Sequence, residues 1–561
     1  MTLPQNALVL YKHNPARVLS SGDKIEIVLA DGRQLKVRPK DVILLHPGPF
    51  QSFADLHPPD GDIETAWELL AGSQTTLPEL AELIYSNYTP ATAWAVWQLV
   101  ADGLYFRGQP DNITALPPDE VARQRADRAR KEAEEAAWHS FLQRLEAGHT
   151  TPDDAPFLRD VEDLALGRQS KSRILRHLGR TQSPENAHAL LLELGFWDET
   201  VNPYPIRFGL PLDPPQAGLP PLPDEPRLDL THLPAFAIDD EGSSDPDDAL
   251  SLDGDRLWVH VADPAAVVSP DSPADLEARA RAAKLYLPEC TVPMLPPEAT
   301  ERLALGLSEV SPALSFGFTL TGDGEISGLE ITPSWVRVQR LTYEEAETRL
   351  SDPPLAGVLR LARQFRDRRL ANGAVEIDLP EVKIRLVEGQ VVIKPLLPLQ
   401  SRMMVREAML MAGEAVARFA EAHGIPLPFT TQDAPDLESA GPLPEGMAGM
   451  FALRRLMTRS QLSSVPGPHA GLGLARYAQA TSPLRRYLDL VMHQQLRAWL
   501  KGQPLLDAGD ILERVGMAES VTGSVRQVER LSNKHWTLVY LQRLGSWQGE
   551  AVLVDRRDLR G

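Results

Sequence analysis

The chain has 561 residues, with 57 Lys and Arg against 77 Asp and Glu, which gives a net charge of −20 at pH 7. This length predicts about three to four domains, and a share of 43% hydrophobic and 24% charged residues is the balance of an ordinary globular protein. The single cysteine, Cys290, excludes an internal disulfide framework and a cysteine-rich zinc module. The acidic balance argues against a polyanionic partner unless the charge is unevenly distributed.

Targeting and membrane segments are not expected from the sequence. The first residues lack a basic region followed by a long apolar run, which is the pattern of a secretory signal. No stretch of about 18 uncharged apolar residues occurs, so no membrane-spanning helix is predicted. These observations predict a soluble cytoplasmic protein without a membrane partner.

The beginning of the chain changes from a strand pattern to a helix pattern. Residues 26–38 contain two alternating apolar runs around an Asp-Gly pair, which indicates a hairpin, and residues 1–50 are predicted to form a small SH3-like β-barrel. Residues 51–118 contain two helical patterns separated by a turn and followed by a strand. This order is typical of a helix-turn-helix or winged-helix unit.

Residues 119–228 are predicted to contain a charged helix, a second helical pair and a proline-rich linker. The mixed signs along the helix favour a solvated surface with ion pairs four residues apart over a binding stripe. Seven prolines between 211 and 226 indicate a stiff, extended linker. Helical pairs also occur in many proteins that bind no nucleic acid, so a binding role for these units stays open.

The second half of the chain mixes strands with long amphipathic helices. We predict that residues 229–545 form a single large α+β domain, and that residues 546–561 begin a further strand. The expected fold class is therefore a multidomain α+β protein, in which a small β-barrel and helical units precede a large mixed α/β domain.

A short acidic segment is the most informative part of the sequence. Residues 239–248, DDEGSSDPDD, carry six carboxylates and no Lys or Arg, and both flanks have a strand pattern. Like charges at the ends of buried strands repel each other strongly without a counter-ion. Ligands that offer only oxygen suit hard cations such as Mg²⁺ or Mn²⁺, and the spacing does not match an EF-hand calcium loop. An exposed acidic turn is the alternative interpretation.

The spacing of Asp239, Asp245, Asp247 and Asp248, followed by Ala-Leu, resembles the catalytic signature of the ribonuclease II (RNB) exoribonucleases. The resemblance implies that Asp239, Asp245 and Asp248 are metal ligands. It also implies that Asp247 is a catalytic carboxylate that binds metal itself or positions metal, water or the RNA 3′ end. Four carboxylates match the charge of two Mg²⁺, with Mn²⁺ as the alternative ion, as two-metal phosphodiester cleavage requires.

Residues 283–296, AKLYLPECTVPMLP, are similar to a family segment in which an aromatic residue stacks on a terminal base. Side chains alternate along a strand, so Tyr286 points away from Leu285 and Leu287. If the leucines face the core, Tyr286 faces the cleft and is available to stack on RNA. A tyrosine that covers the edge of the core is the alternative interpretation.

Residues 469–496 also resemble the family and contain Arg485. Ser482 is expected to cap a helix that begins at Pro483, which would place Arg485 in the first helical turn. There its guanidinium can bind the scissile phosphate and stabilise the transition state, so Arg485 is predicted to be both catalytic and RNA-binding. A weak surface ion pair with Asp489 is the alternative.

Three further residues are candidates for the surroundings of the site. Residues 401–417 resemble a family segment, and the resemblance implies that Glu407 contacts the terminal sugar of the RNA, with an exposed helix-surface glutamate as the alternative. His260 and Asp263 are expected at a strand end beside the acidic segment. Residues 476–497 carry four arginines against one aspartate, a local charge of +3, so RNA is expected to arrive along a confined basic path.

The resemblance covers about residues 229–545 and implies a metal-dependent 3′→5′ exoribonuclease, which hydrolyses single-stranded RNA to 5′-nucleoside monophosphates in RNA turnover. The N-terminal half departs from the paired cold-shock barrels of the family, and residues 546–561 are too few for a complete S1-like barrel, which is expected to be truncated or missing. Two alternatives stay open: a non-catalytic nucleic-acid-binding regulator, and a metal nuclease that acts on DNA or structured RNA.

Overall fold

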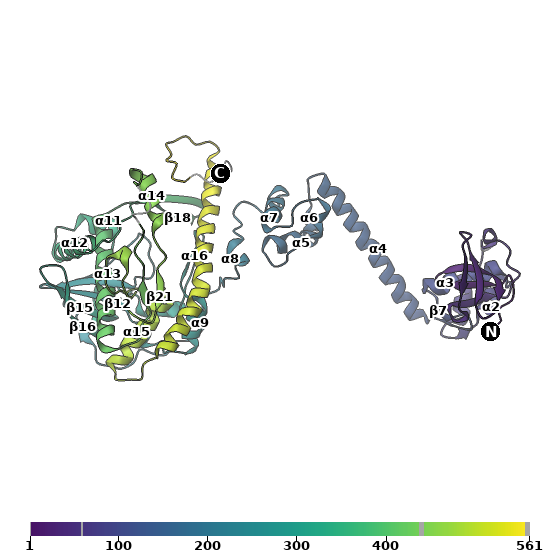
Figure 1. The fold of residues 1–561 in the computed structure, drawn as a ribbon, viewed down its shortest axis with the longest axis horizontal. Helices are drawn as coiled ribbons and strands as arrows, with labels where there is room; N and C mark the ends of the chain where they lie inside the picture. The colour runs from purple at the N-terminus through teal and green to yellow at the C-terminus, as the bar shows by residue number, and fades with distance from the viewer. Residues whose placement is uncertain (1, 58–59, 437–441, 556–561) are drawn as a thin grey trace. The chain divides into compact units, whose positions relative to one another are not determined.

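The computed structural model describes residues 2–57, 60–436 and 442–555, which belong to two compact units, Met1–Phe157 and Leu158–Gly561. Both units contain helices and strands (Figure 1), so the mixed α/β class predicted from the sequence is confirmed. Within the described ranges, no helix combines the length and the apolar character that crossing a bilayer requires.

The chain begins with a five-stranded antiparallel sheet in the order β4-β3-β2-β1-β5. Its strands alternate between buried and outward-facing residues, as in β3, where Ile25, Ile27 and Leu29 are buried. The hairpin predicted over residues 26–38 forms between β3 and β4, and Gly32 adopts the positive φ angle of +84° in its turn. The strands are β1 (Leu8–Tyr11), β2 (Asn14–Ser21), β3 (Ile25–Leu29), β4 (Gln34–Val37) and β5 (Val42–His46).

A winged-helix arrangement follows, with three helices and a small sheet in the order β6-β8-β7. Thr76 caps α2 and Thr89 caps α3, because each side chain accepts a hydrogen bond from the first helical turn. The long helix α4 buries Val121, Phe141 and Leu145 and exposes most of its charged positions, as expected for a solvated helix. The elements are α1 (Ile63–Leu70), β6 (Gln74–Thr75), α2 (Leu77–Tyr85), α3 (Pro90–Asp102), β7 (Phe106–Gln109), β8 (Asn112–Ala115) and α4 (Pro118–Glu146).

Short helices come next, and serine residues cap α6 and α7. Ser172 caps α6 and Ser183 caps α7, because each side chain accepts hydrogen bonds from the first helical turn. Apolar side chains such as Leu164 and Leu190 are buried between these helices and their surroundings. The helices are α5 (Ala155–Ala165), α6 (Arg173–His177), α7 (Pro184–Glu193) and α8 (Tyr204–Arg207).

The proline-rich stretch at 211–226 contains no helix or strand, as predicted, but it is not a free linker. Leu219 and Leu222 pack against the core of the domain that follows, and Glu225 accepts hydrogen bonds from Arg497 at 2.5 and 2.7 Å. The extended chain is anchored to this domain because its apolar side chains and its carboxylate have buried partners there.

The large domain is built on a seven-stranded sheet in the order β17-β10-β11-β12-β15-β16-β9. Leu257 and Val259 of β12 pack on the side of α12 and α13, whereas Trp258 packs on the side of α9 and α16. The acidic segment at 239–248 joins β10 to β11, which pair antiparallel, so its two ends lie side by side at the same end of these two strands. The strands are β9 (Leu228–Asp229), β10 (Ala235–Asp239), β11 (Asp248–Asp253), β12 (Arg256–Ala262), β15 (Ser311–Leu320), β16 (Ile326–Val336) and β17 (Val338–Thr342).

Helices and short two-stranded sheets complete this domain. The hairpin β18–β19 places Ile384 and Leu386 against Trp536 of α16, the long yellow helix in Figure 1. The helices are α9 (Pro273–Arg281), α10 (Pro297–Leu303), α11 (Tyr343–Thr348), α12 (Leu355–Ala371), α13 (Gln400–His423), α14 (Gly446–Leu456), α15 (Tyr487–Leu500) and α16 (Ala508–Leu544). The ribbon strands are β13 (Leu285–Tyr286), β14 (Thr291–Val292), β18 (Glu381–Val387), β19 (Gln390–Leu396), β20 (Phe429–Thr431) and β21 (Gln461–Ser463).

The strand predicted after residue 546 does not form in residues 546–555, which contain neither helix nor strand. The rest of that predicted segment, 556–561, lies outside the described residues.

Candidate active site

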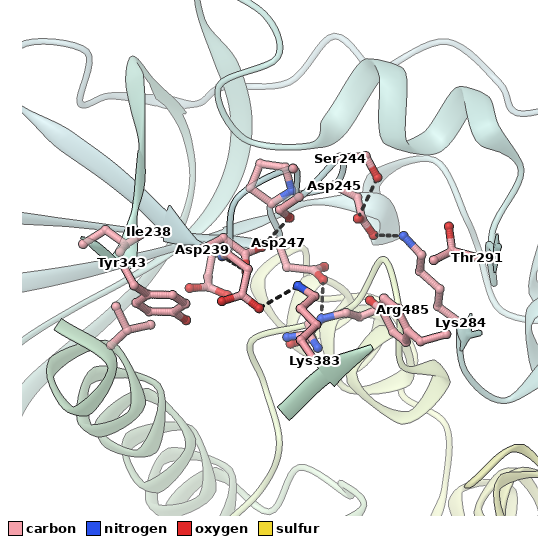
Figure 2. A pocket seen from close by; sticks show the side chains of 18 of the residues that line it. Ile238, Asp239, Ser244, Asp245, Asp247, Lys284, Thr291, Tyr343, Lys383 and Arg485 are labelled. Carbon is pink, nitrogen blue, oxygen red and sulfur yellow. Dashed lines mark hydrogen bonds and ion pairs between the residues drawn. The ribbon is translucent and has the colours of Figure 1, made fainter. Parts of the chain in front are cut away.

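The acidic segment lines a cavity of about 640 Å³ at the end of β10 and the start of β11. Asp239 ends β10, Asp248 begins β11, and Asp245 and Asp247 lie in the loop between them. Lys284, directly before β13, and Arg485, in the turn before α15, contact this loop (Figure 2). Six of the seven residues that the sequence assigned to the site line this one cavity: Asp239, Asp245, Asp247, Asp248, Tyr286 and Arg485.

Asp247 lies at the centre of the site and is 4% exposed. Its Oδ1 accepts the backbone N–H of Leu484 at 2.8 Å, and its Oδ2 accepts Arg485 Nε at 2.9 Å. Burial raises the pKa of Asp247 to about 7, and the positive charge of Arg485 opposes that rise. The ion pair with Asp247 therefore positions the Arg485 guanidinium beside the acidic segment, where it lines the cavity.

The alternative pairing of Arg485 with Asp489 is wrong. Asp489 is buried and accepts Arg486 at 2.7 and 3.0 Å, and it also accepts the backbone N–H of Ser482 at 2.9 Å. The predicted helix start is wrong as well, since α15 begins at Tyr487 and residues 483–485 form a turn. The hydrogen bonds of Asp489 to Ser482 and Arg486 stabilise this turn, so the helix begins only at Tyr487. Arg485, which lies in the turn, lines the cavity.

Asp248 and Asp239 lie on the strand ends that flank the loop. Burial raises the pKa of Asp248 to about 6, with repulsion from Asp239 adding to the rise and Arg485 opposing it. The Asp239 carboxylate accepts the N–H of Asp240 at 2.7 Å and the hydroxyl of Ser243 at 2.5 Å. The loop thus orients the Asp239 carboxylate through its own polar groups.

Asp245 has a partner that the sequence did not indicate. Lys284 Nζ lies 2.7 Å from Asp245 Oδ2 and 5.1 Å from the centre of the Tyr286 ring. The signal for Lys284 was present, because it lies two residues before Tyr286 in an extended segment, and positions two apart share a face. Lys284 is therefore part of the site.

The structure places Tyr286 in the cavity rather than on a core edge. Leu285 and Leu287 are buried, whereas Tyr286 is 41% exposed and lines the cavity. The N–H of Tyr286 donates to Glu529 of α16 at 2.9 Å, which holds this short strand against the helix. Its ring is accessible to a planar ligand.

Glu407 does not line the cavity, and the alternative of an exposed helix-surface glutamate is wrong, while its contact with the terminal sugar stays a prediction. It is fully buried and forms a two-pronged ion pair with Arg369, at 2.9 and 2.6 Å. Position 407 faces the core between α12 and α13, where Arg369 compensates its charge. The face of α13 that lines the cavity carries Arg402, Arg406 and Met409, at the spacing of a single helical face.

His260 in β12 and Asp263 directly after it lie beside the acidic segment, as predicted, because Val261 pairs with Asp248, but neither side chain lines the cavity. His260 is buried between the hydroxyls of Ser251 and Ser315, at 2.8 and 2.7 Å, and burial lowers its pKa to about 3. Asp263 accepts Arg227 and Arg497 at 2.8 and 2.7 Å. Both side chains point into the body of the domain because the sheet has its own buried polar groups to satisfy.

Two of the four arginines expected along the basic path, Arg485 and Arg486, line the cavity. Arg476 pairs with Glu421, and Arg497 pairs with Glu225, so neither lines the cavity. In the described part of the chain, the cations that line it come from the segment before β13, from β18, from α13 and from the turn before α15. They are Lys284, Lys383, Arg385, Arg402, Arg406, Arg485 and Arg486.

The carboxylates fit a hard divalent cation in their chemistry. Asp239, Asp245, Asp247 and Asp248 offer only oxygen, and mutual repulsion contributes to the raised pKa values of Asp247 and Asp248. Within residues 2–57, 60–436 and 442–555, however, no three acidic, histidine or cysteine side chains converge on one point. Lys284 and Arg485 hold Asp245 and Asp247, so both carboxylates would have to turn to share an ion.

Comparison with known proteins identifies two regions of the chain. A family model described as the RNB domain matches residues 227–502, and one described as a double HTH domain matches residues 121–203. The chain is 34% identical to an uncharacterized ribonuclease of Synechocystis sp., over 99% of this chain and 92% of that protein. It is 31% identical to the chloroplastic/mitochondrial ribonuclease II of Arabidopsis thaliana, over 88% and 69%.

Solved structures share the fold. RNase R of Mycoplasma genitalium, in complex with ribose-methylated single-stranded RNA, aligns with a TM-score of 0.52 and 21% identity, over 57% of this chain and 59% of that chain. An active-site mutant of the Dss1 exoribonuclease of Candida glabrata aligns with a TM-score of 0.61 and 17% identity, over 97% and 90%. The arrangement of strands and helices around the cavity is thus a known one.

Proposed function

Because the chain belongs to the RNB family and is a hydrolytic exoribonuclease, we propose that it removes 5′-nucleoside monophosphates from the 3′ end of single-stranded RNA with the help of divalent cations. The observation that carries this proposal is the meeting of four aspartates, Arg485 and Tyr286 in one cavity. RNA turnover is the proposed role, and RNA 3′ ends are the proposed partner. A cytoplasmic location stays a prediction.

The cations of the cavity suit a phosphodiester. Arg485 lies against Asp247, while Lys383 and Arg402 share Asp240 at 2.7 and 2.5 Å. A guanidinium beside the reacting phosphate stabilises the charge that develops on its oxygens in the transition state. We assign this catalytic role to Arg485.

The ring of Tyr286, which lines the cavity, suits stacking on an unpaired base. Stacking of a base on an aromatic side chain contributes about 1–3 kcal/mol and requires a base that has left its duplex. Tyr286 presents its ring to the cavity on the side opposite the buried leucines. This favours a single-stranded 3′ end over a base-paired one at the reaction centre.

The carboxylates suit Mg²⁺ or Mn²⁺. Asp239, Asp245 and Asp248 would hold the cation, and Asp247 would hold it or orient the attacking water beside Arg485. Such a cation supplies a water of lowered pKa and charge for the leaving oxygen. A purely RNA-binding regulator would gain nothing from four repelling aspartates, which disfavours that alternative.

The decisive experiment uses 5′-labelled oligonucleotides and the full chain in Mg²⁺, in Mn²⁺ and in EDTA. We expect a ladder that shortens from the 3′ end of single-stranded RNA, with 5′-nucleoside monophosphates as the product and no reaction in EDTA. Matched DNA and 3′-blocked duplexes in the same assay test sugar and structure selectivity. Endonucleolytic fragments, or full activity in EDTA, would contradict the proposal.

A further inference from the structure

Lys284 connects the parts of the cavity that carry its chemistry. Its backbone N–H donates to the carbonyl of Arg485 at 3.0 Å, and its side chain reaches Asp245 at 2.7 Å. The same ammonium group lies 5.1 Å from the centre of the Tyr286 ring, within the range of a cation–π contact. Lys284 therefore contacts Asp245 and Tyr286 with its side chain and the Arg485 segment with its backbone.

The ammonium group of Lys284 is held in a poorly solvated place. The residue is 8% exposed, and the side chain of Asp245 is 11% exposed. Charges interact more strongly away from bulk water, so this ion pair neutralises Asp245 far more effectively than a surface pair would. Asp245 is thus already compensated by the protein itself.

The ion pairs of the four aspartates define the charge that is left for an added cation. When all four carboxylates are ionised they carry −4, and the direct partners Lys284 and Arg485 return +2, which leaves −2. These pairs also keep the carboxylates apart, in agreement with the absence of three converging acidic side chains in the described residues. The ammonium group of Lys284 therefore supplies to Asp245 a positive charge that a bound metal ion would otherwise supply.

We propose that Lys284 is a built-in cation of the acidic loop: it occupies Asp245, relieves the repulsion among the aspartates and lowers their affinity for divalent cations. This inference rests on the proposed metal dependence. A neutral residue at position 284 frees Asp245 and removes a repelling charge, so it strengthens cation binding. A purely structural role would have the opposite consequence, because a disordered loop binds an ion more weakly.

The test measures the binding of Mn²⁺ to the full chain without RNA, by the electron paramagnetic resonance signal of free Mn²⁺. We expect Lys284→Met and Lys284→Gln each to bind Mn²⁺ at least about tenfold more tightly than wild type, and Lys284→Arg to bind like wild type. Lys284→Gln keeps a hydrogen bond to Asp245 and serves if Lys284→Met does not fold.

Lys394→Met is the matched control. Lys394 pairs with Glu241 of the same loop at 3.2 Å, but its side chain is exposed and does not line the cavity, so its loss should change Mn²⁺ affinity by less than about twofold. Unchanged or weaker binding by a folded neutral variant at 284 overturns the inference alone. If neither wild type nor the neutral variants at 284 bind Mn²⁺, both the inference and the metal dependence fail, while hydrolysis of labelled RNA by the same preparation decides the proposed nuclease activity separately.

Discussion

Arg485 donates its Nε to Asp247 Oδ2 at 2.9 Å across 238 residues of sequence. This ion pair joins the acidic loop after β10 to the turn before α15. Because Asp247 is buried, the two side chains depend on each other for their orientation.

Replacing Asp247 by Asn should abolish turnover and leave RNA binding largely intact. The amide keeps the size of the carboxylate and can still accept the N–H of Leu484, but it lacks the charge that orients Arg485 and a cation. We expect kcat to fall by at least about 100-fold, with the Kd for single-stranded RNA within about threefold of wild type. Asp253→Asn, at the exposed far end of β11, is the control. Near-normal hydrolysis by Asp247→Asn would refute the assignment.

Arg485→Lys should lose catalysis despite keeping its charge. A lysine cannot reproduce the fork of the guanidinium, so it cannot contact Asp247 and a phosphate together. We expect kcat to fall by about 10²–10³-fold and KM to change less, as measured in single-turnover and steady-state assays. A rise in KM with unchanged kcat would mean that Arg485 only binds RNA.

Tyr286 should contribute to RNA affinity through its ring rather than through its hydroxyl. Tyr286→Ala should weaken the binding of a single-stranded 3′ end by about 1–3 kcal/mol, whereas Tyr286→Phe should bind like wild type. Fluorescence anisotropy with labelled RNA in EDTA measures both. Equal losses in the two variants would point to the hydroxyl and argue against stacking.

Glu407 should matter for stability. Glu407→Gln leaves Arg369 as a buried charge without its partner, which should lower the free energy of unfolding by about 3–5 kcal/mol in urea titrations. Glu298→Gln breaks the more exposed pair with Arg302 and should cost about 1 kcal/mol or less. An unaltered unfolding midpoint with impaired RNA binding would restore the sugar-contact assignment from the sequence.

Acid should destabilise the domain through His188. Burial lowers the pKa of His188 to about 4, with the charge of Arg207 adding to the effect. The unfolded chain binds this proton near pH 6.5 and the folded chain does not, so stability is complete above pH 6.5 and falls as the pH drops towards 4. His188→Gln should flatten this fall in Tm between pH 7 and 5, whereas His139→Gln, at an exposed position of α4, should not.

Local patterns predicted much of this protein. The alternation around Tyr286 predicted that its ring points away from Leu285 and Leu287, because neighbours along a strand point to opposite faces. The aspartates of residues 239–248 lie on one loop between paired strands, so their spacing alone was enough to bring them together. Both properties depend on residues that are close in the chain, and sequence periodicity describes such residues well.

The long-range partners were decided only by the tertiary structure. Glu407 has a surface-like pattern on its own helix, yet Arg369, on another helix, makes burial of its charge acceptable. Arg485 has Asp489 at helical distance in sequence, yet Asp489 is taken by Arg486 and Ser482, which leaves Arg485 for Asp247. A charged side chain settles with whichever opposite charge the packed fold brings within reach, and that choice depends on the whole set of neighbours rather than on spacing along the chain.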